Sequence, residues 1–284
     1  MQPWEQLDST TVPGTTTEMS LHRRGDVFSI RVGAVELMNN WIYGIDCGLA
    51  DHGCAALSQR DTARVLIGGL GMGFTLARTL AKLGPKCEVV VAELVPAVVR
   101  WNEELLGDLA HHPLRDPRTK IVQRDVAELI RAEPASWDAI LLDVDNGPEG
   151  LSRKGNDKLY SKAGLAAARE ALRPRGVLGI WSLSGDRSFH GRMKRGGFEV
   201  SEHLVKKRGG RARQLIFVGR PSDAARSASS KDRARSSSSA ARKSNAASGA
   251  TRQSSGAART SSGGPSARRK PGLKSGGGRP ERRT

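Results

Sequence analysis

The feature that most constrains the fold is an apolar run that enters a glycine-rich turn. Residues 64–73 read Arg-Val-Leu-Ile-Gly-Gly-Leu-Gly-Met-Gly, and Glu93 follows a second apolar run, Val89-Val90-Val91-Ala92. Glycines let the backbone approach a ligand closely, and an acid at this offset can accept hydrogen bonds from both hydroxyls of a ribose. The pattern predicts an α/β domain that binds a nucleoside through Gly69, Gly71, Gly73 and Glu93.

Composition divides the chain near residue 220. Residues 221–284 contain one Leu, Leu273, and no Ile, Val or aromatic residue. Such a segment cannot bury enough apolar area to offset its ordering entropy, so we expect it to be disordered. It carries 15 Lys and Arg against 3 Asp and Glu, so +12 of the net charge of +17 lies there and +5 in residues 1–220. The tail is expected to be a solvating segment with no specific partner, with weak, nonspecific contact with nucleic acid as the alternative.

Other features exclude several classes of protein. Three cysteines, Cys47, Cys54 and Cys87, form no CxxC pair, and the N-terminus resembles no secretory leader, which fits a cytoplasmic protein. No run of 18 apolar residues exists, so we expect no membrane span. The histidines show no metal-ligand spacing, so no metal site is predicted.

Residues 1–60 are predicted to form a small β-hairpin element and a linking helix. Strands over 19–22 and 27–31 flank Arg24-Gly25-Asp26, a hairpin signal; a third strand covers 34–38 and a helix 46–59. We expect the aromatic residues Trp41 and Tyr43 to pack in the core.

Residues 61–220 alternate between predicted strands and helices. Strands are expected at 65–67, 88–92, 120–123, 138–142 and 176–182, and helices at 74–83, 96–106, 126–132, 161–172 and 186–195. Two strands then follow directly, 198–205 and 213–218. Apolar strands of this kind suit a parallel sheet buried on both faces, and the final pair implies an antiparallel hairpin at one edge.

Two nucleotide-binding folds compete for this pattern. Dehydrogenases use GxGxxG, whose last small residue allows close packing of helix on strand. Here the turn is GxGxG followed by the bulky Phe74. Sulfonium-nucleoside transferases use GxGxG, and their sheet ends in an antiparallel hairpin. The sequence therefore favours a Rossmann-like class I methyltransferase fold with a seven-stranded, mostly parallel sheet.

Residues 62–183 resemble the spermidine synthases and the wider spermidine-synthase-like group of class I S-adenosylmethionine-dependent transferases. The matching pieces are Val65–Gly69, Ala92-Glu93-Leu94, Asp116-Pro117-Arg118, Arg124-Asp125-Val126, Asp138–Asp143, Asn146-Gly147-Pro148 and Leu159-Tyr160. The resemblance implies a transferase of polyamine biosynthesis that acts on a small amine, in a family that often forms homodimers. It implies that Glu93 holds the ribose, Asp125 accepts from the adenine amino group and Asp143 faces the reacting amine.

The chain departs from the synthases at two places. Their glycine turn, GGGDGG, carries an Asp that pairs with the amine of decarboxylated S-adenosylmethionine, where this chain has Gly71. An Asp there would repel the carboxylate of intact S-adenosylmethionine by about 4 kcal/mol at ~4 Å and an effective dielectric of about 20. Their Asp-Ser-Ser-Asp is Asp143-Val144-Asp145-Asn146 here, so Asp145 is the nearest substitute for the second acid.

Three hypotheses therefore stay open. The first is a spermidine-synthase-like transferase that moves an aminopropyl group from decarboxylated S-adenosylmethionine to a small amine. The second is a methyltransferase that uses intact S-adenosylmethionine, which Gly71 permits. The third is a cofactor-binding module that its tail tethers to nucleic acid.

Three side chains are candidates for the chemistry. A carboxylate that accepts the proton of an attacking amine orients its lone pair, and Asp143 is the best placed. The alternative for Asp143 is a cap on the following turn. Asp145 either attracts a cationic amine or is a solvated loop acid. Tyr160 either closes over the substrate or packs at a helix start.

Overall fold

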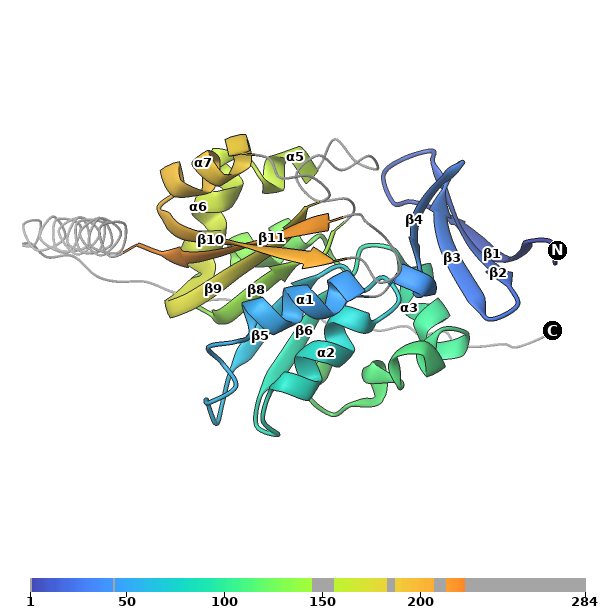
Figure 1. The fold of residues 1–284 in the computed structure, drawn as a ribbon, viewed down its shortest axis with the longest axis horizontal. Helices are drawn as coiled ribbons and strands as arrows, with labels where there is room; N and C mark the ends of the chain where they lie inside the picture. Colours follow the sequence, from blue (N-terminus) through green and yellow to red (C-terminus); the bar gives the residue numbers. More distant parts are fainter. Residues whose placement is uncertain (1, 43, 145–155, 183–186, 207–212, 223–284) are drawn as a thin grey trace, which may run out of the picture. The chain divides into compact units, whose positions relative to one another are not determined.

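The computed structural model describes residues 2–42, 44–144, 156–182, 187–206 and 213–222. The first four strands form an antiparallel sheet in the order β1-β2-β3-β4 (Figure 1). Their bounds are β1 Glu5–Thr11, β2 Glu18–Arg24, β3 Val27–Val32 and β4 Val35–Asn39. The hairpin predicted around Gly25 and the third strand are confirmed. The sequence analysis missed β1, whose residues Glu-Gln-Leu-Asp-Ser-Thr-Thr include one large apolar side chain.

The rest of the described chain alternates between helices and strands, as predicted. The segment begins with the 3₁₀ turn η1 (Asn40–Ile42) and α1 (Gly44–Gly53). Next come β5 (Arg64–Gly68), α2 (Phe74–Lys82), β6 (Glu88–Ala92), α3 (Pro96–Glu104), η2 (Gly107–Ala110), η3 (Pro113–Arg115), β7 (Thr119–Val122), α4 (Val126–Ala132) and β8 (Trp137–Leu142). The segment ends with α5 (Asn156–Leu159), α6 (Lys162–Ala171), β9 (Leu172–Ser182), α7 (Arg187–Arg195), β10 (Phe198–Lys206) and β11 (Arg213–Pro221).

The large sheet has seven strands in the order β10-β11-β9-β8-β5-β6-β7. Strands β5 to β9 pair in parallel, whereas β11 pairs antiparallel with both β9 and β10. This is the predicted Rossmann-like arrangement with an antiparallel C-terminal hairpin. The chain leaves β5 toward β6 and β7 on one side and returns to β8 on the other. Ligands of open α/β sheets bind at such a reversal, beyond the carboxyl ends of the strands.

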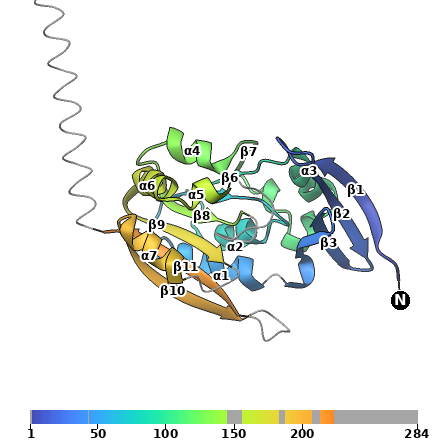
Figure 2. The ribbon, with the colours of Figure 1, turned by 90° about the horizontal axis from the view of Figure 1, so that it is seen from above.

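Helices cover both faces of the large sheet, which explains its apolar strands. Alternate residues of each strand enter two separate clusters, as Val65 and Leu66 of β5 show. The cluster with Val65 also holds buried residues of α1, α2, α3 and the N-terminal sheet. The cluster with Leu66 holds residues of α4, α6 and α7. Figure 2 shows α4 and α6 on one side of the sheet and α1 on the other.

The N-terminal sheet is attached to α3 by polar contacts as well as by its apolar face. Asp8 of β1 accepts a hydrogen bond from the Trp101 indole at 2.6 Å and forms an ion pair with Arg100. Helix α1, predicted as part of the N-terminal element, packs instead on the large sheet, where Leu49 lies against Gly179 of β9. The boundaries at residues 60 and 220 stay predictions, and residues 223–284 of the basic tail lie outside the described residues.

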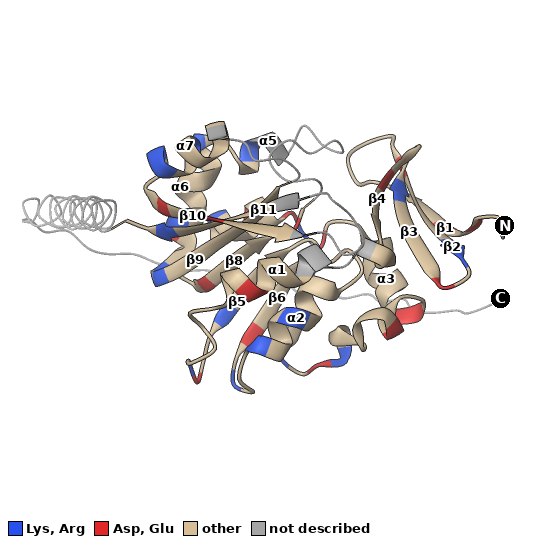
Figure 3. Ribbon diagram, viewed as in Figure 1, with Lys and Arg blue, Asp and Glu red and all other residues tan. Residues whose placement is uncertain are grey.

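Lys, Arg, Asp and Glu residues are distributed along the helices and strands of both sheets (Figure 3). The last turn of α7 carries Arg192, Lys194 and Arg195, which favourably oppose the helix dipole. The expectation that Trp41 packs in the core is wrong, because 71% of its surface is exposed; Tyr43 lies outside the described residues. In the described part of the chain, the helices all fall short of the length and apolarity that crossing a bilayer requires.

Candidate functional site

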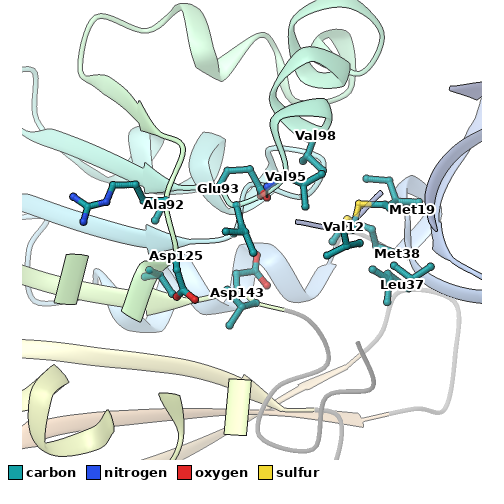
Figure 4. Close-up of a pocket in the computed structure, with 18 residues that line it drawn as sticks. Val12, Met19, Leu37, Met38, Ala92, Glu93, Val95, Val98, Asp125 and Asp143 are labelled. Carbon is teal, nitrogen blue, oxygen red and sulfur yellow. Dashed lines mark hydrogen bonds between the residues drawn. The ribbon is translucent and has the colours of Figure 1, made fainter. Parts of the chain in front are cut away.

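A cavity lies where β5, β6, β7 and β8 end, under the N-terminal sheet. Gly69, Glu93, Asp125 and Asp143, each shortly after one of these strands, line it together. Figure 4 shows Asp125 and Asp143 on one side of the cavity and apolar side chains of the N-terminal sheet on the other. The full lining is Val12, Met19, Ile30, Val32, Leu37, Met38, Gly69, Gly71, Ala92, Glu93, Leu94, Val95, Val98, Arg124, Asp125, Val126, Asp143 and Val144.

The turn after β5 needs glycine for two physical reasons. Gly69, Gly71 and Gly73 all have positive φ angles, of 88°, 53° and 82°, a region that favours glycine. The neighbouring chain is also close, because a Cβ at Gly69 would lie 2.4 Å from the carbonyl oxygen of Asp143. Asn102 of α3 fixes the turn by donating to the carbonyl of Gly71 at 2.8 Å. The turn therefore presents bare backbone to the cavity in a fixed shape.

Glu93 is buried at the centre of the lining, with 8% of its surface exposed. Its Oε2 accepts from the backbone N–H of Leu70 at 2.8 Å, and its Oε1 from that of Val95 at 2.8 Å. The side chain thus joins the glycine turn to the start of α3. Each carboxylate oxygen has two acceptor positions, so both oxygens can also accept from a sugar diol.

Asp125 stands at the start of α4 and caps that helix. Its Oδ1 accepts from the backbone N–H of Ala127 at 2.8 Å, a typical N-cap bond. The neighbouring Arg124 also lines the cavity and pairs with Glu128 at 3.3 Å. The cap holds the Asp125 carboxylate in a defined orientation at this end of the cavity.

Asp143 combines burial with a polar contact. Its backbone N–H donates to Gly68 at 2.9 Å, which continues the pairing of β8 with β5. Its Oδ2 accepts from the Thr75 hydroxyl at 2.6 Å. Desolvation raises the pKa of Asp143 to about 6, although Thr75 and the Trp181 indole act in the opposite direction. A carboxylate with this pKa is ionised at neutral pH and readily accepts a proton.

The structure thus brings together five of the predicted site residues: Gly69, Gly71, Glu93, Asp125 and Asp143. Gly73 does not line the cavity. It precedes α2, where a Cβ would lie 3.0 Å from Asn102 Oδ1. Asp145 lies outside the described residues.

Tyr160 does not line the cavity either. Its ring is 1% exposed and meets the Phe189 ring edge-on at 5.8 Å, in the apolar cluster beneath α6 and α7. Of the two alternatives for Tyr160, packing in the protein core describes this position, because apolar side chains already enclose the ring. A role in closing over the substrate is not supported by this position.

Sequence reasoning missed three contributions to the site. Thr75 and Asn102 are ordinary helix residues in the sequence, and their roles depend on contacts with Asp143 and Gly71. The apolar wall comes from strands far away in the chain. A hydroxyl in the first turn of the helix after a glycine turn is the one signal that points to Thr75.

The charges around the cavity favour a cationic ligand. Three carboxylates, Glu93, Asp125 and Asp143, line it against one guanidinium, Arg124. A concave site with this balance attracts positive charge. Within the described residues, no three His, Cys, Asp or Glu side chains gather around a point that could hold a metal ion.

Comparison with known proteins shows what this part of the chain is similar to. Residues 52–183 match the model of the spermine/spermidine synthase domain. This part of the chain is therefore similar to the spermine/spermidine synthase domain. Polyamine aminopropyltransferase 1 of Streptomyces coelicolor is 33% identical over 124 residues, which are 43% of this chain and 22% of that protein. The chain therefore spans about a fifth of the length of this curated relative.

Solved structures of spermidine synthases share the fold of this domain. The Thermotoga maritima spermidine synthase superposes with a TM-score of 0.63 at 16% identity, over 76% of this chain and 72% of that one. A spermidine synthase in complex with the transition-state analogue AdoDATO gives a TM-score of 0.61 at 16% identity, with the same coverage. A probable spermidine synthase from Corynebacterium glutamicum gives 0.54 at 19%, over 76% and 79%. The resemblance read from the sequence and the predicted fold class are confirmed.

Proposed function

We propose that this protein is a transferase that moves an aminopropyl group from decarboxylated S-adenosylmethionine to a small amine. The observation that carries the proposal is the convergence of Glu93, Asp125 and Asp143 around the Gly69–Gly71 backbone in one cavity. The name of the curated relative, a polyamine aminopropyltransferase, supports the class of reaction and acceptor.

The residues of the cavity fit a sulfonium nucleoside. The excess of carboxylates suits its positive charge, and the glycine turn leaves backbone open to it. We assign the ribose hydroxyls to Glu93 and the adenine amino group to Asp125. A bound sulfonium nucleoside supplies an electrophilic carbon next to a sulfur that leaves as a neutral thioether.

The chain's own contribution to the chemistry centres on Asp143. An attacking amine must be neutral, and it carries an extra proton once its nitrogen has formed the new bond to carbon. Asp143 is ionised at neutral pH and can accept that proton, while the Thr75 hydroxyl fixes the carboxylate. Alignment of nitrogen and carbon provides the rest of the rate enhancement.

A product assay tests the proposal. The full chain is incubated with decarboxylated S-adenosylmethionine and a series of α,ω-diamines, and 5′-methylthioadenosine and the alkylated amine are measured by mass spectrometry. Release of both in equal amounts is expected, with loss of turnover in Asp143→Asn. Asp26→Asn, the same change in an exposed turn, is the matched control. Absence of the alkylated amine with every acceptor would refute aminopropyl transfer.

Methyl transfer from intact S-adenosylmethionine is the second candidate. The observation that favours it is Gly71, which places no charge against the carboxylate of the intact cofactor. The same assay with intact S-adenosylmethionine and detection of S-adenosylhomocysteine separates the two reactions.

The basic tail supports a further proposal, weak contact with nucleic acid. Its net charge of +12 is the basis. Deletion of residues 223–284 should remove any salt-dependent binding to duplex DNA or RNA and leave nucleoside binding unchanged. Retention of that binding in the truncated protein would exclude the tail as its source.

A further inference from the structure

The wall that the N-terminal sheet contributes to the cavity is apolar throughout. Its side chains are Val12, Met19, Ile30, Val32, Leu37 and Met38. A β-bulge brings two consecutive residues to this wall. Ile30 pairs with Met38 and Arg31 with Glu36, so Leu37 is the extra residue of β4. Regular strands send neighbouring side chains to opposite faces, whereas this bulge lets both Leu37 and Met38 line the cavity.

The side chain of Met38 lies close to the glycine turn on the other side of the cavity. A Cβ at Gly71 would lie 2.8 Å from Cε and 3.0 Å from Sδ of Met38. No real side chain tolerates that contact unless the thioether moves. The Met38 side chain therefore occupies the space into which any larger residue at position 71 would extend.

We propose that Met38 determines which donor nucleosides the site admits. The inference rests on the proposed nucleoside site, in which Asp125 and Glu93 hold the base and sugar and the sulfur substituent continues toward Asp143 and Met38. An uncharged, polarizable thioether then meets that substituent. On the N-terminal wall, the described lining residues carry no charge, so the wall neither pairs with an ammonium nor repels a carboxylate.

The consequence is that the N-terminal wall selects by size and not by charge, so any charge preference of the wild-type site comes from Glu93, Asp125 and Asp143. The ratio of the dissociation constants of carboxylated and decarboxylated S-adenosylmethionine in the wild-type protein is the reference for each variant at position 38. An acid at position 38 should change this ratio. At ~4 Å and an effective dielectric of about 20, one charge pair changes affinity by up to about a thousandfold, and solvent screening reduces this toward tenfold.

Calorimetric titration of the full chain with both nucleosides tests the inference. Met38→Asp should prefer the decarboxylated form by about tenfold or more. Met38→Leu, which keeps volume without charge, should keep the wild-type ratio. Val35→Asp adds the same charge to the same strand at a position that is 45% exposed and outside the cavity lining, and it should also keep that ratio.

A second pair of variants decides the matter if Met38→Asp does not fold. Gly71→Asp alone should weaken the binding of both nucleosides, because the Met38 thioether must move to make room for the new side chain. Gly71→Asp combined with Met38→Ala should recover binding of the decarboxylated form only, since Asp tolerates a positive φ better than most residues.

The outcomes separate this inference from the proposed function. A wild-type protein that binds both nucleosides, with no change of ratio in any acidic variant, overturns the role of Met38 and leaves the nucleoside site intact. A wild-type protein that binds neither nucleoside overturns the proposed function, and the role of Met38 with it.

Discussion

Replacement of Asp143 by asparagine should stabilise the protein while it abolishes turnover. Desolvation raises the pKa of this carboxyl from 3.8 to about 6, so the folded protein holds its proton more tightly than the unfolded chain does. Wild-type stability therefore falls as pH rises from about 3.8 to about 6, and it stays at the lower level above that range. An asparagine has no proton to lose, so the variant escapes this decline.

The magnitude follows from the size of the shift. Each pKa unit corresponds to 1.36 kcal/mol, so the ionised Asp143 costs about 3 kcal/mol at neutral pH. At pH 5 only about half of this is present. The stability difference between Asp143→Asn and wild type should thus grow between pH 5 and pH 8, by on the order of 1 kcal/mol. The Thr75 hydroxyl can donate to the asparagine oxygen, so its bond is not lost.

Urea unfolding at pH 5, 6, 7 and 8 measures this difference. Asp138→Asn is the matched control, since Asp138 is 4% exposed on the same strand but pairs with Arg60 at 2.6 Å and Arg173 at 2.7 Å. Loss of that charge leaves two guanidinium groups without their partner and should destabilise by about 3 kcal/mol. A constant difference between Asp143→Asn and wild type across this pH range would refute the argument that burial raises this pKa.

Three further outcomes follow from the site. Glu93→Gln should weaken the binding of adenosine analogues at least tenfold in calorimetry, and unchanged affinity would remove Glu93 from the nucleoside site. Asn102→Ala removes the hydrogen bond to the Gly71 carbonyl. It should lower the free energy of unfolding by about 1–2 kcal/mol, measured by denaturant unfolding, and raise the KM for the cofactor, measured by kinetics. Thr75→Val removes a bond that lowers the Asp143 pKa, so the acid limb of kcat/KM should move upward from about pH 6; an unmoved limb would contradict this role.

The fold was predictable because its signals are local. Apolar runs of strand length, glycines at a tight turn and two strands without a helix between them identify the sheet and its hairpin. Once the strands are parallel, topology brings Glu93, Asp125 and Asp143 to one edge without further information. Strand β1 escaped prediction because its polar residues give little periodic signal, and its pairing depends on β2.

The parts of the site that were missed depend on contacts between distant segments. Met38 enters the cavity through a bulge that exists only in the pairing of β3 with β4, and residue type alone does not reveal it. The burial of Tyr160 and Trp41 is equally hard to predict from the sequence. Tyr160, a candidate for closing over the substrate, lies in the core, and Trp41, expected in the core, is exposed, because burial depends on the packing of the whole domain.

Two different sheets form the walls of the cavity, and this affects how the specificity of such a protein can change. The carboxylates belong to a sheet whose register tolerates little change, whereas the opposing wall belongs to four short strands that carry none of the proposed proton-transfer or nucleoside-binding carboxylates. Substitutions in the small sheet can therefore change which molecule the cavity admits, while the carboxylates of the large sheet stay the same. Homologues with a common glycine turn should then differ in preference chiefly through their first forty residues.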